Sequence, residues 1–377
     1  FGALSEEATR IQNLSDGEDV KSTRRCLESL GASVTPEGDA VRIRGWGGGI
    51  PKEPEDLLDT GNSGTTFRLL TGLLSAVPVF SVLTGDASLR SRPMDRVVSP
   101  LRQMGAKIEG REQGRFAPIS IQGGGLNPIR YRSPVASAQV KSALLLAGLK
   151  LSGETVVTEP NLSRDHTERM LQSMGASIRR EGTTVILTGG GSLRAKEFVV
   201  SGDPSSAAFL LVAALICRDS DLWVRQLCVN PTRTGFLKVL ERMGARIEQG
   251  PVCMTSGEPV ADLRARSSRL RATNIESEEV PACIDEIPIL CVAAAFAEGT
   301  TTIRGARELR VKESDRIDAM VRNLLKMGVP VQEAPDGMTI QGTGKVEAFQ
   351  GDSVGDHRIA MSLAVAALAG RGACEIH

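Results

Sequence analysis

Apolar residues recur at helical spacing before five glycines spread along the chain. In "SRPMDRVVSPLRQMGA" the side chains of Met94, Val98, Leu101 and Met104 form one apolar stripe, and Gly105 follows directly. A glycine at this place is typical of the left-handed residue that ends a helix. A strand such as "AKIEG" comes next. The same order of helix, glycine and strand is repeated at Gly31, Gly105, Gly175, Gly244 and Gly328.

A second helical pattern alternates with the first and is apolar nearly all round. It occurs in "GNSGTTFRLLTGLL", "VASAQVKSALLLAGL", "GDPSSAAFLLVAALI", "CIDEIPILCVAAAFA" and "GDHRIAMSLAVAALA". Helices of this composition are expected inside a domain, buried on every side. Each starts with a polar, turn-forming segment, so polar groups gather at the helix N-termini. Free N–H groups and the positive end of the helix dipole favour anionic ligands there.

The repeat divides the 377 residues into two similar halves. Buried helices are expected to open near Phe1, Gly64, Ser137, Ser205, Asp285 and His357, three in each half. We place the boundary at "VVSGD", which predicts an N-terminal domain of residues 1–200 and a C-terminal domain of residues 201–377. The predicted fold class is α/β (or α+β), with three helix-and-strand repeats in each domain. A cleft between the domains is the default ligand site.

Both ends of the sequence fall inside the repeat. Phe1 lies where a buried helix closes, and His377 lies in or just after a strand. We therefore expect the parent protein to extend beyond both ends, so that both predicted domains are truncated here.

Charge and composition exclude several classes of protein. With 45 Lys and Arg against 45 Asp and Glu, no overall basic field attracts nucleic acid or an anionic membrane. No apolar run approaches the roughly 20 residues that span a bilayer. The seven cysteines show no metal-ligand spacing, and they suit small core positions in a reducing compartment. We expect a cytoplasmic monomer, with any anion site built locally.

Six motifs together resemble the 5-enolpyruvylshikimate-3-phosphate synthase family over essentially the whole chain. They are "GNSGTTFR" (61–68), "SRPMDR" (91–96), "SAQVKSALLLAGL" (137–149), "SRDHTERM" (163–170), "LRVKESDRI" (309–317) and "GDHRIAM" (355–361). The resemblance implies two domains of three βαβαββ-type units that close on their substrates. It implies transfer of the enolpyruvyl group of phosphoenolpyruvate to the 5-hydroxyl of shikimate 3-phosphate, with release of phosphate. The family needs no metal or organic cofactor.

Both of these substrates carry a phosphate and a carboxylate, so a neutral protein must meet them with clustered cations. If "LRVKESDRI" is helical, Lys312 and Arg316 lie one turn apart on one face. Two like charges at this spacing repel mildly unless an anion lies between them. Addition followed by elimination also needs a base and a proton donor. Glu313, between the two cations, is a candidate for that work.

The resemblance implies a role for individual residues. Asp285 receives the proton of the 5-hydroxyl, and Glu313 with Lys312 handles protonation and charge at the enolpyruvyl carbon. The implied contacts of shikimate 3-phosphate are Ser137, Ala138 through its backbone, Gln139, Arg164, Asp285 and Lys312. The implied contacts of phosphoenolpyruvate are Asn62, the Gly64 backbone, Arg92, Gln139, Arg316 and Arg358.

Simpler structural roles remain open for the same residues. Asn62 to Gly64, and separately Asp285, could only cap helices. Arg164 could lie on a solvated helix face, and "KESDR" could form surface ion pairs that contribute little.

Rival functions also remain. The UDP-N-acetylglucosamine enolpyruvyl transferase shares this chemistry but has a reactive Cys about where Ala87 stands. RNA 3′-terminal phosphate cyclase has a more distantly similar fold. The chain could also be a non-catalytic anion-binding module within a longer polypeptide. Two family features, a Lys-Ser…Arg loop and a last cationic residue, would lie before Phe1 and after His377, which leaves the activity of this chain open.

Overall fold

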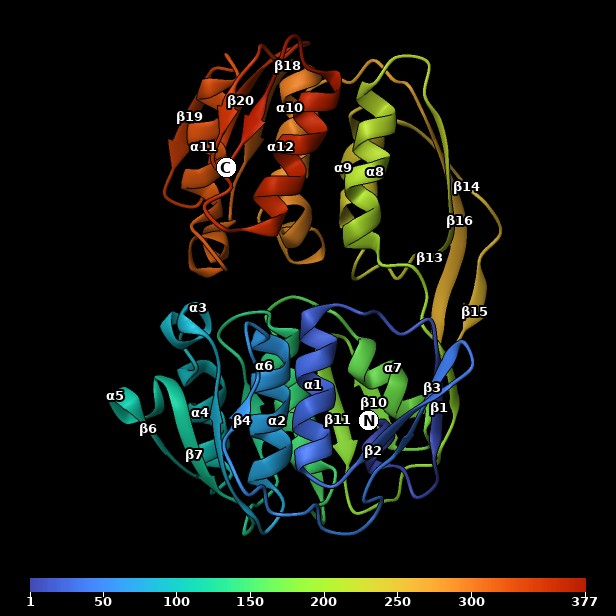
Figure 1. The fold of residues 1–377 in the computed structure, drawn as a ribbon, viewed down its shortest axis with the longest axis vertical. Helices are drawn as coiled ribbons and strands as arrows, with labels where there is room; N and C mark the ends of the chain where they lie inside the picture. The colour runs from blue at the N-terminus through green and yellow to red at the C-terminus, as the bar shows by residue number, and fades with distance from the viewer. The chain divides into compact units, whose positions relative to one another are not determined.

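The computed structural model describes residues 1–377, which form two compact units. Unit 1 consists of Phe1–Val200 together with Thr255–Gly257. Unit 2 consists of Ser201–Met254 and Glu258–His377. In Figure 1, unit 1 runs from blue to green and unit 2 from yellow-green to red.

Unit 1 contains three four-stranded sheets that share one order of strands. In each sheet a short strand pairs in parallel with a second strand, and two antiparallel strands complete the sheet. The sheets are β12 (Glu197–Val199), β1 (Thr9–Gln12), β3 (Ala40–Arg44), β2 (Ser33–Glu37); β4 (Leu58–Asp59), β5 (Phe80–Thr84), β7 (Phe116–Gln122), β6 (Lys107–Gly110); and β8 (Arg130–Arg132), β9 (Glu154–Thr158), β11 (Thr184–Thr188), β10 (Ser177–Glu181).

Unit 1 contains helices that differ in how far they are buried. They are the 3₁₀ turn η1 (Gly2–Leu4) and α1 (Glu18–Ser29), α2 (Gly64–Ser75), α3 (Ala87–Ser91), α4 (Asp95–Gln103), α5 (Arg111–Gly114), α6 (Ala138–Gly148) and α7 (His166–Ser173). The central pair, α2 and α6, touch closely, because a Cβ added to Gly72 would lie 2.2 Å from the carbonyl oxygen of Ala143. Backbone contact this close requires glycine.

Unit 2 repeats the plan in part. The sheet β17 (Asn274–Ile275), β18 (Glu298–Ile303), β20 (Gly337–Thr343), β19 (Val331–Ala334) has the same strand order as in unit 1. A second sheet contains β13 (Asp221–Cys228), β16 (Glu258–Arg266) and β14 (Arg246–Gln249), with β15 (Cys253–Thr255) also on β16. The third is the parallel pair β21 (Gln350–Gly351) and β22 (Glu375–Ile376), which places the predicted strand beside His377.

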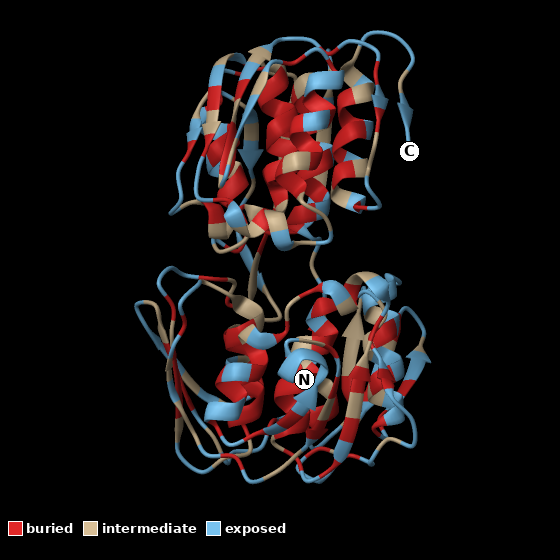
Figure 2. Ribbon diagram, turned by 90° about the vertical axis from the view of Figure 1, so that its left-hand side faces the viewer, coloured by how far each residue is buried: buried red, intermediate tan, exposed pale blue.

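Unit 2 contains three 3₁₀ turns and five α-helices, of which α8, α10 and α12 are central. They are α8 (Pro204–Ile216), α9 (Gly235–Arg242), η2 (Val280–Ala282), η3 (Ile284–Glu286), α10 (Ile287–Phe296), η4 (Arg307–Val311), α11 (Arg316–Lys326) and α12 (His357–Ala369). Helices α8, α10 and α12 contact one another. Figure 2 shows buried residues concentrated in the central helices of each unit.

The helix-ending glycines are confirmed. Helices α1, α4, α7, α9 and α11 each stop just before the glycine that the sequence pattern named. The φ angles at Gly31, Gly105, Gly175, Gly244 and Gly328 are 91°, 103°, 90°, 84° and 75°. These are left-handed values, which glycine adopts without the steric cost that a Cβ brings.

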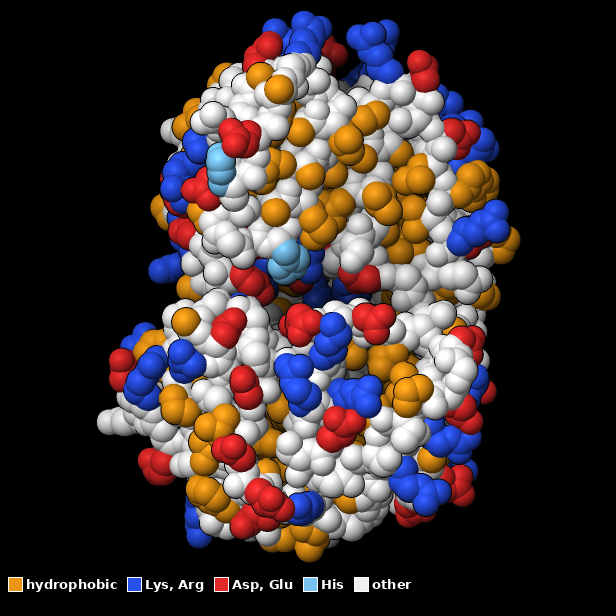
Figure 3. Space-filling model, viewed as in Figure 1, with side chains coloured by type: hydrophobic (Ala, Val, Ile, Leu, Met, Phe, Trp, Pro, Cys, Tyr) orange, Lys and Arg blue, Asp and Glu red, His pale blue; other side chains and the backbone are white.

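The prediction of burial on every side is right for some central helices and wrong for two. Every residue of α10 except Phe296 is buried. In contrast, Leu210 of α8 is 57% exposed and Leu368 of α12 is 70% exposed. Figure 3 shows the hydrophobic surface over these two helices. Composition alone could not predict this outcome, because an all-apolar helix carries no pattern that marks an exposed face.

No helix in the chain is both long and apolar enough to cross a membrane.

Candidate active site

In unit 1 the polar residues of the motifs meet at the N-terminus of α2. Ser63 caps this helix, since its Oγ accepts a hydrogen bond from the Thr66 N–H at 3.2 Å. The Asn62 side chain contacts other side chains instead of capping the helix. Its side-chain amide donates to Asp86 Oδ2 at 2.7 Å, and its carbonyl oxygen accepts a hydrogen bond from Arg92. The capping alternative therefore holds for Ser63, while Asn62 binds a guanidinium.

Arg92 is held in place by groups from two elements. It follows α3 and is 8% exposed, and its Nη2 also donates to Ser88 Oγ at 3.1 Å. Asp86 caps α3 by accepting a hydrogen bond from the Leu89 N–H at 2.7 Å. Burial acts to raise the pKa of Asp86, but hydrogen bonds from the Leu89 N–H and Asn62, with the charge of Arg92, lower it. Asp86 is therefore an anion that stabilises the arginine and its asparagine partner.

A second arginine lies beside the first. Arg68 Nη1 donates to Gln139 Oε1 at 2.6 Å, and Gln139 Nε2 donates to Thr65 Oγ1 at 2.8 Å. A Cβ added at Gly64 would lie 2.8 Å from Arg68 Nη1 and 3.5 Å from Arg92 Nη1. Gly64 thus separates two guanidinium groups. The predicted residues Gly64, Arg92 and Gln139 lie together, and Arg68 joins them.

The start of α6 contains two further predicted residues, beside Gln139. Ser137 caps this helix, and Ala138 and Gln139 are its first residues. The Ser137 N–H donates to Glu159 Oε1 at 2.8 Å. Arg164 lies in the segment between β9 and α7, and it is half-buried. The structure therefore places Arg164 on the residues that lead into α7, not on an exposed helix face.

Residues 309–317 do not form the single helix that was considered for them. A 3₁₀ turn, η4, ends at Val311, and α11 begins at Arg316. Asp315 caps α11, because its Oδ1 accepts hydrogen bonds from the N–H groups of Ile317 and Asp318, both at 3.1 Å. A cap of this kind interrupts the chain just where the helical face was expected to continue. Lys312 and Arg316 are therefore not on one helix face.

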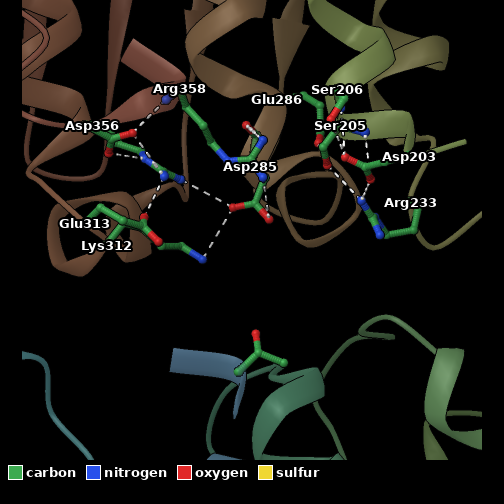
Figure 4. A network of polar contacts seen from close by, with 12 residues as sticks. Asp203, Ser205, Ser206, Arg233, Asp285, Glu286, Lys312, Glu313, Asp356 and Arg358 are labelled. Carbon is green, nitrogen blue, oxygen red and sulfur yellow. Dashed lines mark hydrogen bonds and ion pairs between the residues drawn. The ribbon is translucent and has the colours of Figure 1, made fainter. Parts of the chain in front are cut away.

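The two cations nevertheless approach the same carboxylate. Lys312 Nζ lies 3.7 Å from Asp285 Oδ1, and Arg316 Nη1 lies 3.4 Å from the same oxygen. Asp285 belongs to η3, and its side chain makes no helix cap. Its capping alternative is thus wrong, and the residue instead joins two cations (Figure 4).

Arg316 is the centre of this cluster. Only 1% of its side chain is exposed. Its Nε donates to Asp356 Oδ2 at 2.8 Å and its Nη2 donates to Glu313 Oε2 at 2.5 Å. Three carboxylates from three segments, on Asp285, Glu313 and Asp356, therefore share one guanidinium. Sequence reasoning missed Asp356, although it stands directly before His357 in the "GDHRIAM" motif.

Asp356 also connects the cluster to α12. It caps that helix by accepting a hydrogen bond from the Arg358 N–H at 2.9 Å, and it accepts another from Ser314 Oγ at 3.0 Å. Burial acts to raise the pKa of Asp356, but the hydrogen bonds and charge of Arg316 lower it. Asp356 is therefore ionised at neutral pH.

Arg358 completes the set. Its Nη1 donates to the Asp285 carbonyl oxygen at 3.2 Å, and its Nη2 lies 4.0 Å from Asp285 Oδ2. The cluster then holds three cations and three carboxylates, namely Lys312, Arg316, Arg358, Asp285, Glu313 and Asp356. Its formal charge is zero, as it is for the whole chain. An anionic ligand entering here must exchange partners with a carboxylate, since the cations already have partners.

A second network lies beside Asp285 in unit 2 (Figure 4). The neighbouring Glu286 is 1% exposed and accepts a hydrogen bond from Ser205 Oγ at the start of α8. Arg233 Nη2 donates to Ser205 Oγ at 2.8 Å and to Asp203 Oδ1 at 2.7 Å. This network anchors the turn that holds Asp285 to the beginning of α8. No group of three or more His, Cys, Asp or Glu side chains is placed to hold a metal ion.

Fold and site together define an α/β protein of repeated helix-and-sheet units, with arginine clusters at the starts of its buried helices. A family model described as EPSP synthase (3-phosphoshikimate 1-carboxyvinyltransferase) matches residues 1–377. The chain belongs to the EPSP synthase family.

Curated relatives and solved structures agree with this assignment. The chain is 55% identical to a 3-phosphoshikimate 1-carboxyvinyltransferase of Thermosynechococcus vestitus, over 100% of the chain and 87% of that protein. It is 52% identical to the protein of the same name from a Geobacter species, over 100% of the chain and 88% of that protein. A solved EPSP synthase from Acinetobacter baumannii matches with a TM-score of 0.88 and 44% identity, over 100% of the chain and 87% of that structure's chain. The predicted α/β fold class and family resemblance are confirmed.

Proposed function

We propose that the chain transfers the enolpyruvyl group of phosphoenolpyruvate to the 5-hydroxyl of shikimate 3-phosphate and releases phosphate. The observation that carries this proposal is the cluster around Arg316. Asp285, Lys312 and Glu313, the three residues expected to do the acid–base work, lie on or beside that one guanidinium. The family assignment supplies the two substrates.

The reaction proceeds by addition and then elimination. The 5-hydroxyl oxygen bonds to the carbon of phosphoenolpyruvate that bears the phosphate, and its proton passes to Asp285. The neighbouring methylene carbon gains a proton from Glu313 and becomes a methyl group. In the second step a methyl proton leaves with Glu313 as the base, the bond between carbon and the phosphate oxygen breaks, and phosphate departs. Lys312 offsets negative charge as the oxygens develop it.

The surroundings of these carboxylates suit the two steps. Asp285 Oδ1 is 3.7 Å from Lys312 Nζ and 3.4 Å from Arg316 Nη1, so cations balance it before it takes a proton. Glu313 has 30% of its side chain exposed and keeps one oxygen on Arg316. A partly exposed carboxyl group can exchange a proton with solvent between cycles.

Cations and helix N-termini bind the substrates. Phosphoenolpyruvate contacts Asn62, the Gly64 backbone, Arg92, Gln139, Arg316 and Arg358. Shikimate 3-phosphate contacts Ser137, the Ala138 backbone, Gln139, Arg164, Asp285 and Lys312. Paired guanidinium donors fit the two oxygens of a phosphate or a carboxylate, which a lysine cannot match. Because Arg316 is buried and occupied, its contact with phosphoenolpyruvate requires Glu313 or Asp285 to release it.

The position of Ala87 supports shikimate 3-phosphate over a UDP-linked sugar as the acceptor. Ala87 is the first residue of α3, directly after the Asp86 cap. A reactive thiol in this segment would mark the other enolpyruvyl transferase, and alanine offers none.

We also propose that the protein works as a cytoplasmic monomer, in keeping with its seven free cysteines. Light scattering after size-exclusion chromatography tests the monomer.

The test is a phosphate-release assay with both substrates present. Asp285→Asn and Glu313→Gln keep the size of each side chain but remove its base. Each change is expected to lower kcat by about a hundredfold or more, while shikimate 3-phosphate still binds. Glu347→Gln is a matched control, because Glu347 is exposed and paired with Lys345 instead of the cluster. Wild-type rates in both carboxylate variants would refute the assigned roles.

A further inference from the structure

A buried lysine lies one turn into α6, where the polar helix start meets the core. Lys141 is 2% exposed, and it stands among the buried residues of α6. Its Nζ lies 2.9 Å from Glu159 Oε2 and 2.8 Å from Glu168 Oε1. Glu159 follows β9, and Glu168 belongs to α7. The lysine thus joins three elements of unit 1 through two carboxylates.

The two carboxylates differ in what else they bind. Glu159 Oε1 accepts a hydrogen bond from the Ser137 N–H at 2.8 Å, and its Oε2 accepts one from Ser163 Oγ at 2.8 Å. Ser137 opens the segment 137–139, and Ser163 directly precedes Arg164. Glu159 therefore ties together the two segments of unit 1 that we propose to bind shikimate 3-phosphate. Glu168 contacts Lys141 and accepts a hydrogen bond from its own backbone N–H.

Stability alone does not account for this arrangement. Removing charges from water costs several kcal/mol for each ion, and well-packed apolar side chains of similar size often do as well or better. A triad of one lysine and two glutamates is also short of one positive charge. What the triad supplies, and an apolar group could not, is a fixed acceptor for the Ser137 N–H and for the Ser163 hydroxyl.

We propose that Lys141 and Glu159 are positioning residues for the shikimate 3-phosphate site, which they hold at a fixed spacing between Ser137 and Arg164. The inference rests on the proposed function. Lys141 locks the Glu159 carboxylate so that one oxygen faces each segment. The N–H groups at the start of α6 and the Arg164 side chain then meet the anionic substrate without first reorganising, and a displacement of about 1 Å in such a site can cost about a hundredfold.

Glu159→Gln and Glu168→Gln form a matched pair that tests the inference. Both remove one buried negative charge next to the same ammonium group, with no change in size. A glutamine at 159 has one acceptor oxygen and one donor NH₂, so it cannot accept from both serines and Lys141. Glu168→Gln leaves in place the hydrogen bonds that Ser137 and Ser163 donate to Glu159.

The readout is KM and kcat for phosphate release, with each substrate varied in turn. Glu159→Gln is expected to raise KM for shikimate 3-phosphate by about tenfold to a hundredfold. KM for phosphoenolpyruvate and kcat should change several-fold less. Glu168→Gln should keep both KM values within about twofold of wild type, since positioning does not depend on Glu168. Equal KM values in two folded variants would overturn the inference, since a purely structural triad treats both changes alike.

A milder variant covers the case in which Glu159→Gln does not fold. Glu159→Asp keeps the charge but shortens the side chain by one methylene, so the carboxylate cannot span the same gap. KM for shikimate 3-phosphate should again rise, and an unchanged value overturns the inference. If the wild-type chain releases phosphate normally, an unchanged KM in Glu159→Asp overturns only the inference and does not affect the proposed function. If the wild-type chain releases none, the proposed function fails and the inference fails with it.

Discussion

At the scale of single residues, Gly64 shows how little space the arginine pair leaves. The site where its Cβ would stand is 2.8 Å from Arg68 Nη1 and 3.5 Å from Arg92 Nη1. The first distance is shorter than real Cβ contacts allow, so a larger residue must push a guanidinium aside. Small residues at such positions adjust the fit of a ligand more than the stability of the fold.

Gly64→Ala is expected to raise KM for phosphoenolpyruvate by about tenfold or more, because the methyl group displaces Arg68 or Arg92. KM for shikimate 3-phosphate should move less. Gly48→Ala is the control, since nothing lies within 4 Å of its added Cβ. Steady-state kinetics of both variants measure the effect. A Gly64→Ala enzyme with wild-type KM for phosphoenolpyruvate would remove Gly64 from the proposed site.

Glu168 gives a second prediction at this scale, on pH and stability. Burial raises its pKa above the ordinary 4.5, and the attraction of Lys141 only partly opposes that. The folded protein therefore holds this proton to higher pH than the unfolded chain does. The associated stability is complete below pH 4.5 and is lost as the pH rises through the raised pKa.

Glu168→Gln removes this titration. The melting temperature of the variant minus that of the wild type should become more positive as the pH increases from 4.5 towards 8. Thermal unfolding at several pH values measures the difference. A difference that stays constant across this range would contradict the raised pKa.

At the scale of elements, the start of α11 determines where Arg316 lies. Asp315 accepts two backbone hydrogen bonds there, both at 3.1 Å, and its Oδ2 lies 2.9 Å from Arg310 Nη1. Asp315→Ala should lower the free energy of unfolding by about 1 to 2 kcal/mol through the lost cap. Asp318→Ala, on the same helix with an exposed partner, should cost no more than about 0.5 kcal/mol. Urea denaturation compares them, and equal losses would mean that the cap contributes nothing special.

The same element shows what sequence could and could not predict. One apolar stripe followed by glycine sufficed to place α1, α4, α7, α9 and α11, because both signals are local. The break between η4 and α11 also has a local signal, because Asp315 before Arg316 and Ile317 is a recognisable helix start. This cap outweighs the helical spacing of Lys312 and Arg316. The exposed faces of α8 and α12 had no local signal.

In the candidate site, too, local sequence signals predict some features and miss those that depend on distant segments. Each motif pointed to its own residues, but the convergence of Asp285, Glu313 and Asp356 on Arg316 depends on segments far apart in the chain. Arg68 was within reach of sequence reasoning, since it stands one helical turn after Gly64 in "GNSGTTFR". Glu159 was not, because no motif marks the residue after β9 as a partner for Lys141.

At the scale of the whole molecule, the chain has a formal net charge of zero, and so does the cluster around Arg316. The chain has 45 cationic and 45 acidic residues, and the cluster around Arg316 has three of each. A site of this kind does not attract anions through net charge. Under the proposed function, an anion replaces one of the carboxylates, so we expect affinity to depend on the chemistry of the ligand more than on ionic strength.

The central claim is that this cluster adds a proton to phosphoenolpyruvate and later removes one. The reaction run in deuterated water tests it most directly. Addition converts the methylene carbon to a methyl group with one solvent deuteron, so elimination must leave deuterium in part of the product's methylene. Mass spectrometry of the product made by the wild-type enzyme should detect this label, and Glu313→Gln should form little product. Phosphate release with a wholly unlabelled product would contradict the account.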